Sequence, residues 1–253
     1  MNKQTINIVW LKRDVRSQDH EPLLRAEHAG VPYRIIYLFE PTLIEYPDTS
    51  LRHLQFIYHS ILSLNKTLAP FNRQIDVFYG EAIDVFENIN AHFDVKTIFS
   101  YKESGTQITW QRDKKINRFC KHNQIIWKEY QRDGILRGIK NRDDWTKKWH
   151  ISMHKPMLKN RYSMAELKSF EHPFLLPKIL ETQLKEYPKQ FQPAGEQNAI
   201  RYLKSFAAKR GFNYQNHISK PTESRTACSR LSPYLAWGNI SIKQAFQYIG
   251  THP

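Results

Sequence analysis

Five short apolar runs, separated by amphipathic helical patterns, constrain the fold of this chain more than any other feature. The runs have the composition of buried strands, and they cover Ile6–Leu11, Tyr33–Phe39, Ile75–Tyr79, Thr97–Tyr101 and Ile125–Tyr130. Apolar residues recur at helical spacing between them, over Glu21–His28, Leu51–Leu68, Ile83–Phe93 and Thr109–His122. Alternating strands and helices predict parallel βαβ units, and therefore an α/β fold with a doubly wound, five-stranded, mainly parallel sheet.

The second half of the chain has a different pattern. Residues 133–190 contain no strand–helix repeat, and prolines interrupt their periodicity, which predicts a long connection with some short helices. Helical patterns resume from about Gly195, over Asn198–Lys209, Pro233–Trp237 and Ile242–Ile249. We therefore expect an α/β domain over 1–132, an interdomain connection over 133–194 and the start of an all-α domain over 195–253.

The chain is strongly basic, with a formal net charge of +14 and a pI of about 9.7. The excess is uneven, because the window from Arg112 to Lys168 holds 16 Lys or Arg against 6 Asp or Glu. This distribution favours an acidic partner, and nucleic acid first. A well-solvated basic face is the alternative.

Several common site patterns are missing from the sequence. There is no GxGxxG or GxxxxGK, and the turn after the first strand, Lys12-Arg13-Asp14, has no glycine for a dinucleotide grip. The two cysteines, Cys120 and Cys228, are far apart, and neither a CxxC nor an HExxH occurs, so we predict no metal site. The apolar stretch before Lys12 is too short for a signal peptide or membrane span, which predicts a cytoplasmic protein without membrane contact.

Two stretches carry candidate chemistry. In INIVWLKRDVRSQDHEPLLRA, residues 6–26, a strand runs directly into alternating Arg and Asp residues, which predicts ion pairs that fix the turn. In TACSRLSPYLAWGNIS, residues 226–241, Ser232-Pro233 is a helix start with Ser229 and Arg230 just before it. Hydroxyls and an Arg beside a helix N-terminus favour a phosphate site, and a capped helix after a polar loop is the alternative.

Both stretches resemble signatures of the DNA photolyase/cryptochrome family. The first is similar to the family's Trp-Phe-Arg-Arg-Asp-Leu-Arg string and its following Asp-Asn pair, with Lys12, Val15 and His20 in place of an Arg, the Leu and the Asn. The second is similar to the Thr-Ser-Arg-Leu-Ser string that grips the FAD pyrophosphate in the family, with Cys228 in place of the Thr. A thiol is a weaker hydrogen-bonding group than a hydroxyl, so Cys228 is expected to make a weaker hydrogen bond to the pyrophosphate than the family's Thr.

The resemblance implies FAD as the cofactor, and it implies which residues bind it. These are Tyr214, which matches a Tyr close to the flavin, and Cys228, Ser229, Arg230, Leu231 and Ser232 of the string. It also implies a second, light-harvesting chromophore, a folate or a deazaflavin, in the α/β domain. The implied function is light-driven repair of pyrimidine dimers in DNA by electron transfer from reduced FAD, in a monomeric deoxyribodipyrimidine photolyase.

The segments that carry most of the chemistry in this family follow the part that the chain matches. We therefore predict no catalytic residue here, and we expect an N-terminal fragment that is inactive alone. Two other functions stay open. One is a cryptochrome, a blue-light sensor without repair activity, and the other is a non-catalytic α/β nucleotide-binding protein whose helical extension is structural.

Overall fold

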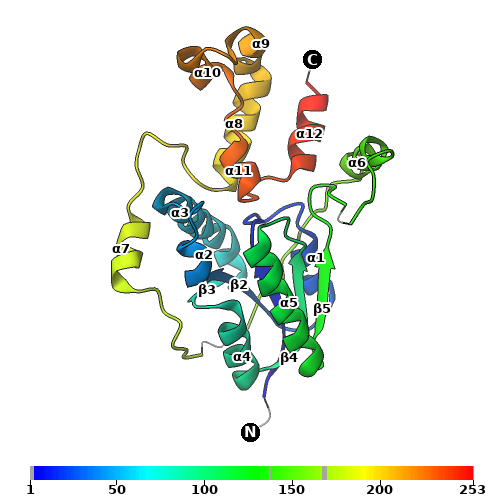
Figure 1. Ribbon diagram of the computed structural model, residues 1–253, viewed down its shortest axis with the longest axis vertical. Helices are drawn as coiled ribbons and strands as arrows, with labels where there is room; N and C mark the ends of the chain where they lie inside the picture. The colour runs from blue at the N-terminus through cyan, green and yellow to red at the C-terminus, as the bar shows by residue number, and fades with distance from the viewer. Residues whose placement is uncertain (1–2, 137, 167–169, 253) are drawn as a thin grey trace.

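The computed structural model describes residues 3–136, 138–166 and 170–252. Its first part is a five-stranded sheet in the order β3-β2-β1-β4-β5, in which every neighbouring pair is parallel, with helices on both faces (Figure 1). The strands are β1 (Thr5–Leu11), β2 (Tyr33–Phe39), β3 (Ile75–Tyr79), β4 (Asp94–Tyr101) and β5 (Ile126–Tyr130). The predicted doubly wound sheet is confirmed.

The four amphipathic stretches all form helices that cover the sheet. These helices are α1 (Glu21–His28), α3 (Leu51–Leu68), α4 (Ala82–His92) and α5 (Gln107–His122). A short α2 (Pro41–Ile44) and a 3-10 turn, η1 (Ala69–Phe71), lie at the two ends of α3. Helix α2 was not predicted, because four residues contain too little periodicity to indicate a helix.

Apolar side chains fill both faces of the sheet, which explains the continuous apolar runs. On one face, Ile8 and Trp10 of β1 pack with residues of α4 and α5 such as Phe86. On the other face, Val9 and Leu11 pack with residues of α1 and α3. The burial of every residue of β2 follows from this two-sided cover.

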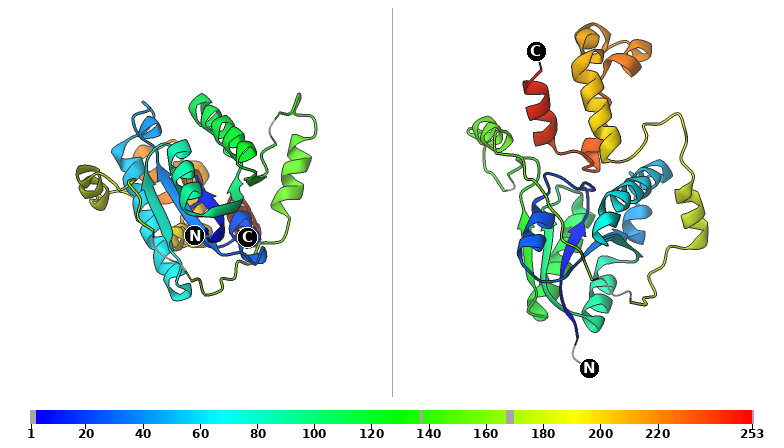
Figure 2. Two further views of the ribbon diagram at one scale, coloured as in Figure 1. Left: turned by 90° about the horizontal axis from the view of Figure 1, so that it is seen from below. Right: turned by 180° about the vertical axis from the view of Figure 1, so that it is seen from behind.

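The connection after β5 contains the short helices α6 (Trp145–Met153) and α7 (Lys178–Lys185), and then a helical layer follows. The layer consists of α8 (Glu196–Ala208), η2 (Arg210–Asn213), α9 (Tyr214–His217), α10 (Pro221–Ala227), α11 (Ser232–Ala236) and α12 (Ile242–Gly250). Its core includes Leu203 and Tyr234 and also Phe56 of α3, so α3 joins the two parts (Figure 2). In the part of the chain that the structure describes, we find no helix with the length and apolarity needed to cross a membrane.

Candidate functional site

The strand order reverses between β1 and β4, and a cavity opens at the carboxyl ends of the strands near this point. Crevices of this kind are where doubly wound sheets bind ligands. The cavity has about 710 Å³ of space that no atom fills, part of it solvent at the mouth. Its charged and aromatic lining residues are Trp10, Lys12, Arg13, Tyr37, Phe39, Glu40, Tyr46, Asp48, Glu103, Arg112 and Trp237. The lining of aromatic and charged side chains suits a small-molecule site.

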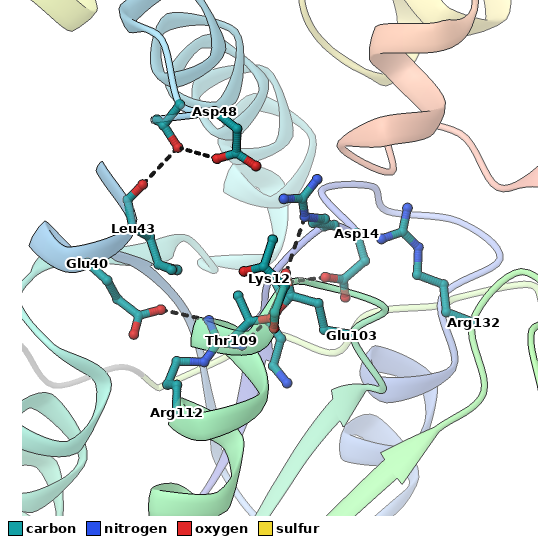
Figure 3. A network of polar contacts seen from close by, with 12 residues as sticks. Lys12, Asp14, Glu40, Leu43, Asp48, Glu103, Thr109, Arg112 and Arg132 are labelled. Atoms are coloured by element: carbon teal, nitrogen blue, oxygen red, sulfur yellow. Dashed lines mark hydrogen bonds and ion pairs between the residues drawn. The ribbon is translucent and has the colours of Figure 1, made fainter. Parts of the chain in front are cut away.

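Arg112 is the centre of an ion network beside this cavity (Figure 3). Its Nη1 lies 2.8 Å from Glu40 Oε1, and its Nη2 lies 2.6 Å from Glu103 Oε2. Its Nη2 also lies 2.8 Å from Asp113 Oδ1, and Arg13 Nε lies 3.2 Å from Glu103 Oε1. Glu40 follows β2 and Glu103 follows β4, so the parallel sheet brings the two carboxylates to one edge.

The two buried carboxyls of this network differ in their proton affinity. Burial raises the pKa of Glu40 above its usual value, and the attraction of Arg112 offsets this only in part. Burial acts on Glu103 in the same direction, but Arg112, Lys12 and Arg13 together hold the pKa of Glu103 below its usual value. Glu103 is therefore the firmly ionised member, and Glu40 is the one whose charge depends most on Arg112.

The loop after β1, residues Lys12–His20, is held by a buried Asp14–His20 pair. His20 Nε2 lies 2.7 Å from Asp14 Oδ2, and His20 Nδ1 accepts a hydrogen bond from Leu23 N–H at 3.2 Å. Because Nδ1 is an acceptor, the proton of the neutral ring is on Nε2. The expected Arg–Asp pairing of this turn is therefore wrong for Asp14, since its partner is a histidine that also caps α1.

The same loop is the docking site for the helical layer. Arg16 donates to the carbonyl oxygens of Asp19 and Gly238, at 2.9 and 3.3 Å. Asp19 accepts from Ser241 Oγ at 2.6 Å and lies 2.7 Å from Lys243 Nζ. Four further hydrogen bonds join the loop to the helical layer. Val15 N–H donates to Trp237 O, and Asn239 Nδ2 donates to Val15 O. Ser17 donates to Glu196 Oε2 through both its N–H and its Oγ. The loop thus fixes α8 and α12 against the sheet.

Gly238 makes the closest approach in this docked region, and its substitution gives a clear prediction. Its φ is +71°, and an added Cβ would lie 2.3 Å from Arg13 O and 2.5 Å from Asp14 Cα. Both contacts are with backbone, so Gly238→Ala should lower the free energy of unfolding by at least about 1–2 kcal/mol. Amide exchange at Val15, which donates to Trp237 O, should accelerate in the same variant.

Gly250→Ala is the matched control. Gly250 ends α12, and nothing lies within 4 Å of its added Cβ. This substitution should be neutral or slightly stabilising. Equal losses in the two variants would show that the close approach at Gly238 does not matter.

The string Cys228–Ser232 lies between α10 and α11, and Arg210 holds it in place. The guanidinium of Arg210 donates to Cys228 O at 2.5 Å and to Ser229 O at 3.2 Å. It also donates to Tyr202 O of α8 at 2.8 Å. Arg210 was not identified from the sequence, because the pattern before the string suggested no role for it. The loop is therefore anchored by protein contacts alone.

Within the string, the side chains follow the prediction in part. Leu231, and not Ser232, occupies the cap position of α11, and Ser232 is its first residue. Ser229 Oγ accepts from Leu231 N–H at 3.4 Å, and Arg230 has a left-handed φ of +59°. Since α11 has five residues, its dipole adds little to phosphate binding. Any grip on an anion must come from the side chains and the first amides of α11.

In the sequence, helix α10 separates Tyr214 from the string. It begins α9, which contacts α10, and its ring packs edge-on against Phe206 with centroids 6.0 Å apart. Ser232 and Pro233 line a hollow together with residues of α3 and the segment before α8.

The comparison that decides the family covers the α/β part. The sequence model described as DNA photolyase matches residues 7–138, more than half of the chain. The chain belongs to the DNA photolyase family. The predicted membership of the photolyase/cryptochrome family is thereby confirmed.

Relatives within and around this family include both repair enzymes and cryptochromes. A deoxyribodipyrimidine photo-lyase of Buchnera aphidicola is 24% identical over 96% of this chain and 53% of its own length. A Synechocystis cryptochrome DASH is 28% identical over 38% of this chain and 21% of its own length. The structure of an archaeal photolyase from Sulfolobus tokodaii, solved with two FAD molecules, has a TM-score of 0.74 and 24% identity, covering 97% of this chain and 55% of its own.

The chain thus spans about half the length of the photolyases that it matches over most of its own sequence. At such identities, the structural likeness concerns the fold. What this member of the DNA photolyase family binds and does depends on its own residues.

Proposed function

We propose that this protein is a photolyase-type flavoprotein that binds FAD through residues 228–232 and takes part in light-driven repair of pyrimidine dimers in DNA. Membership of the DNA photolyase family is the observation that carries the proposal. Reduced FAD, when bound, supplies the electron that splits the dimer after excitation by light. The rest of the proposal concerns what the residues of this chain do for that cofactor.

The string has the groups that a pyrophosphate needs. Ser229 and Ser232 provide hydroxyls, and the first amides of α11 have no acceptor within the helix. Arg230 Nη1 makes a long contact of 3.4 Å to Arg225 O, so a phosphate can replace this contact at small cost. A charge-assisted hydrogen bond from Arg230 is therefore the main expected contribution. We assign Cys228, Leu231 and Tyr214 supporting roles, in shaping the loop and contacting the cofactor.

We place a second, light-harvesting chromophore in the cavity at the carboxyl ends of the strands. Its cations Lys12, Arg13 and Arg112 already lie beside carboxylates, so the cavity mainly offers aromatic walls and oxygen acceptors. A planar ring with N–H donors fits such walls, and both a folate and a deazaflavin carry one. The relative from Sulfolobus tokodaii, with its two FAD molecules, supports the presence of two separate sites.

A cryptochrome without repair activity is the second candidate. The match to the Synechocystis cryptochrome DASH favours it, although that match covers less of this chain than the match to the Buchnera photolyase. The net charge of +14 favours the photolyase instead, because a basic protein attracts the phosphates of DNA. The division at residues 132 and 194, the monomeric state and the cytoplasmic location stay predictions.

A comparison of FAD with riboflavin tests the role of the string. Riboflavin has the flavin ring without the pyrophosphate, so FAD should bind the purified protein at least tenfold more tightly by fluorescence titration. Arg230→Ala should remove most of this difference, because a hydrogen bond to a charged group contributes about 1.5–3 kcal/mol. Arg225 is a neighbouring exposed arginine, and the Arg225→Ala variant should retain the preference for FAD over riboflavin.

Equal affinities for the two flavins, or an unchanged preference in Arg230→Ala, would contradict the phosphate role. The string would then be a structured loop before a helix. Repair of dimers by the illuminated protein with added reduced FAD would favour the photolyase over the cryptochrome, and it would contradict the expectation that the chain is inactive alone.

A further inference from the structure

Helix α6 carries a group of exposed cations that the proposed flavin sites do not use. We define the α6 cluster as Lys140, Arg142, Lys147, Lys148 and Lys155, which lie on the helix and in the segments directly before and after it. All five side chains are exposed. Lys148 lies 3.9 Å from Asp144, and among the described residues the other four have no carboxylate within ion-pair distance. The cluster holds five positive charges against the two negative charges of Asp143 and Asp144, so the surface stays positive.

The inner side of α6 is fixed, so these cations are held on a firm support. Trp149 packs edge-on against Phe246 of α12, with centroids 5.4 Å apart. Gln247 Nε2 donates to Met153 O at 2.7 Å and to Lys155 O at 2.8 Å. Figures 1 and 2 both show α6 beside α12, at the end of the molecule where the helical layer begins.

An exposed indole accompanies the cations. Trp145 stacks on Trp149 with centroids 6.3 Å apart and an interplanar angle of 18°, and 38% of its surface is exposed. Its ring is therefore open to a further aromatic partner. Proteins that bind nucleic acid strands combine positive charge along the backbone with aromatic rings on which bases stack.

We propose that the α6 cluster and Trp145 form a DNA-binding surface that holds the phosphate backbone next to the helical layer. DNA is chosen as the partner because of the proposed repair function, on which this inference rests. A membrane-surface helix would keep its apolar side free for lipid. In α6, Trp149 instead packs against Phe246 of α12 and Met153 is buried, which leaves Ile151 and Trp145 as its exposed apolar side chains, too few for a lipid-binding face.

A charge-matched pair of triple variants tests the surface. One is Arg142→Gln, Lys147→Gln and Lys148→Gln in the α6 cluster, and the other is Lys114→Gln, Lys115→Gln and Arg118→Gln on α5. All six positions are exposed, so both proteins should fold, and both lose the same charge. Binding to a fluorescein-labelled undamaged duplex is measured by anisotropy over a series of salt concentrations, without flavin or light.

The α6 triple should weaken DNA binding about tenfold or more at 100 mM salt. Its plot of log affinity against log salt should be shallower by roughly 0.9 for each phosphate contact that is lost. The α5 triple should weaken binding less than threefold, through net charge alone. Trp145→Ala should weaken binding to single-stranded DNA more than binding to duplex.

Equal effects of the two triples, or no measurable binding by the unmodified protein, would overturn the proposal. So would binding to phosphatidylserine vesicles that is lost in the α6 triple while DNA binding is retained, because α6 would then be a lipid-binding element. Since these assays contain no flavin, their outcome is independent of whether FAD binds residues 228–232.

Discussion

Replacing Arg112 by Met should destabilise the protein by about 3–5 kcal/mol at neutral pH, because it leaves the buried carboxylate of Glu40 without its cation and removes one of the cations beside Glu103. Glu40 and Glu103 are both buried, and both contact this guanidinium, at 2.8 and 2.6 Å. Met keeps much of the volume of the arginine stem, so the loss of stability comes mainly from the missing positive charge. Urea unfolding at several pH values measures the effect.

The pH dependence of this variant has a definite sign. Without Arg112, the pKa of Glu40 in the folded protein, already raised by burial, rises further above its unfolded value. The folded state then binds more protons, so stability falls as pH rises through this window, and the defect is smallest at acidic pH. Adding Glu40→Gln to the variant should recover part of the loss.

Arg118→Met is the control for this prediction. Arg118 lies on the same helix but is exposed, so its replacement should change stability by less than about 0.5 kcal/mol. If Arg112→Met costs no more than Arg118→Met, the network has no role in holding the edge of the sheet together.

His20→Ala should cost roughly 2–4 kcal/mol, because it removes a helix cap and leaves a buried carboxylate without its partner. His20 and Asp14 are both almost fully buried, and their contact is 2.7 Å. His20→Asn should cost much less, since the amide can accept from Leu23 N–H and donate to Asp14. Asparagine is also the residue expected here from the family signature.

The two variants should also differ from the unmodified protein in acid. Burial lowers the pKa of His20, and the contact with Asp14 offsets this only in part. Below the usual histidine pKa of about 6.5, the unfolded chain takes up a proton more readily than the folded one, so stability falls as pH falls. His20→Asn should lack this loss between about pH 6.5 and 5, as followed by urea unfolding. An Asn variant with the full acid dependence would contradict the assignment of His20 as a buried neutral ring.

The fold was largely predictable because its signals are local. Each strand is buried on both faces and is therefore a continuous apolar run, as in Tyr33–Phe39. The apolar positions of helix α3 recur at helical spacing because one side of this helix is buried. Helix α10 was missed, since PTESRTA is polar and buries only Ala227. A helix of this kind depends on its surroundings rather than on its own pattern.

The candidate sites were less predictable because their parts come from distant segments. Residues 228–232 could be proposed as a site because they are contiguous and resemble a family string. The Arg112–Glu40–Glu103 network joins one residue of α5 to two residues that follow different strands, and no spacing in the sequence relates them. The contact of Asp19 with Ser241 spans 222 residues, so the docking role of the loop after β1 appears only in the folded chain.

Amide hydrogen exchange with and without FAD tests the central claim most directly, since it locates the flavin. The account predicts slower exchange at Leu231, Ser232 and Tyr234 when FAD is added, and no slowing there in Arg230→Ala. Protection confined to the cavity at the strand ends, at residues such as Thr106 and Thr109, would contradict it. The flavin would then occupy the site that we assign to the second chromophore, and the string would not be its phosphate grip.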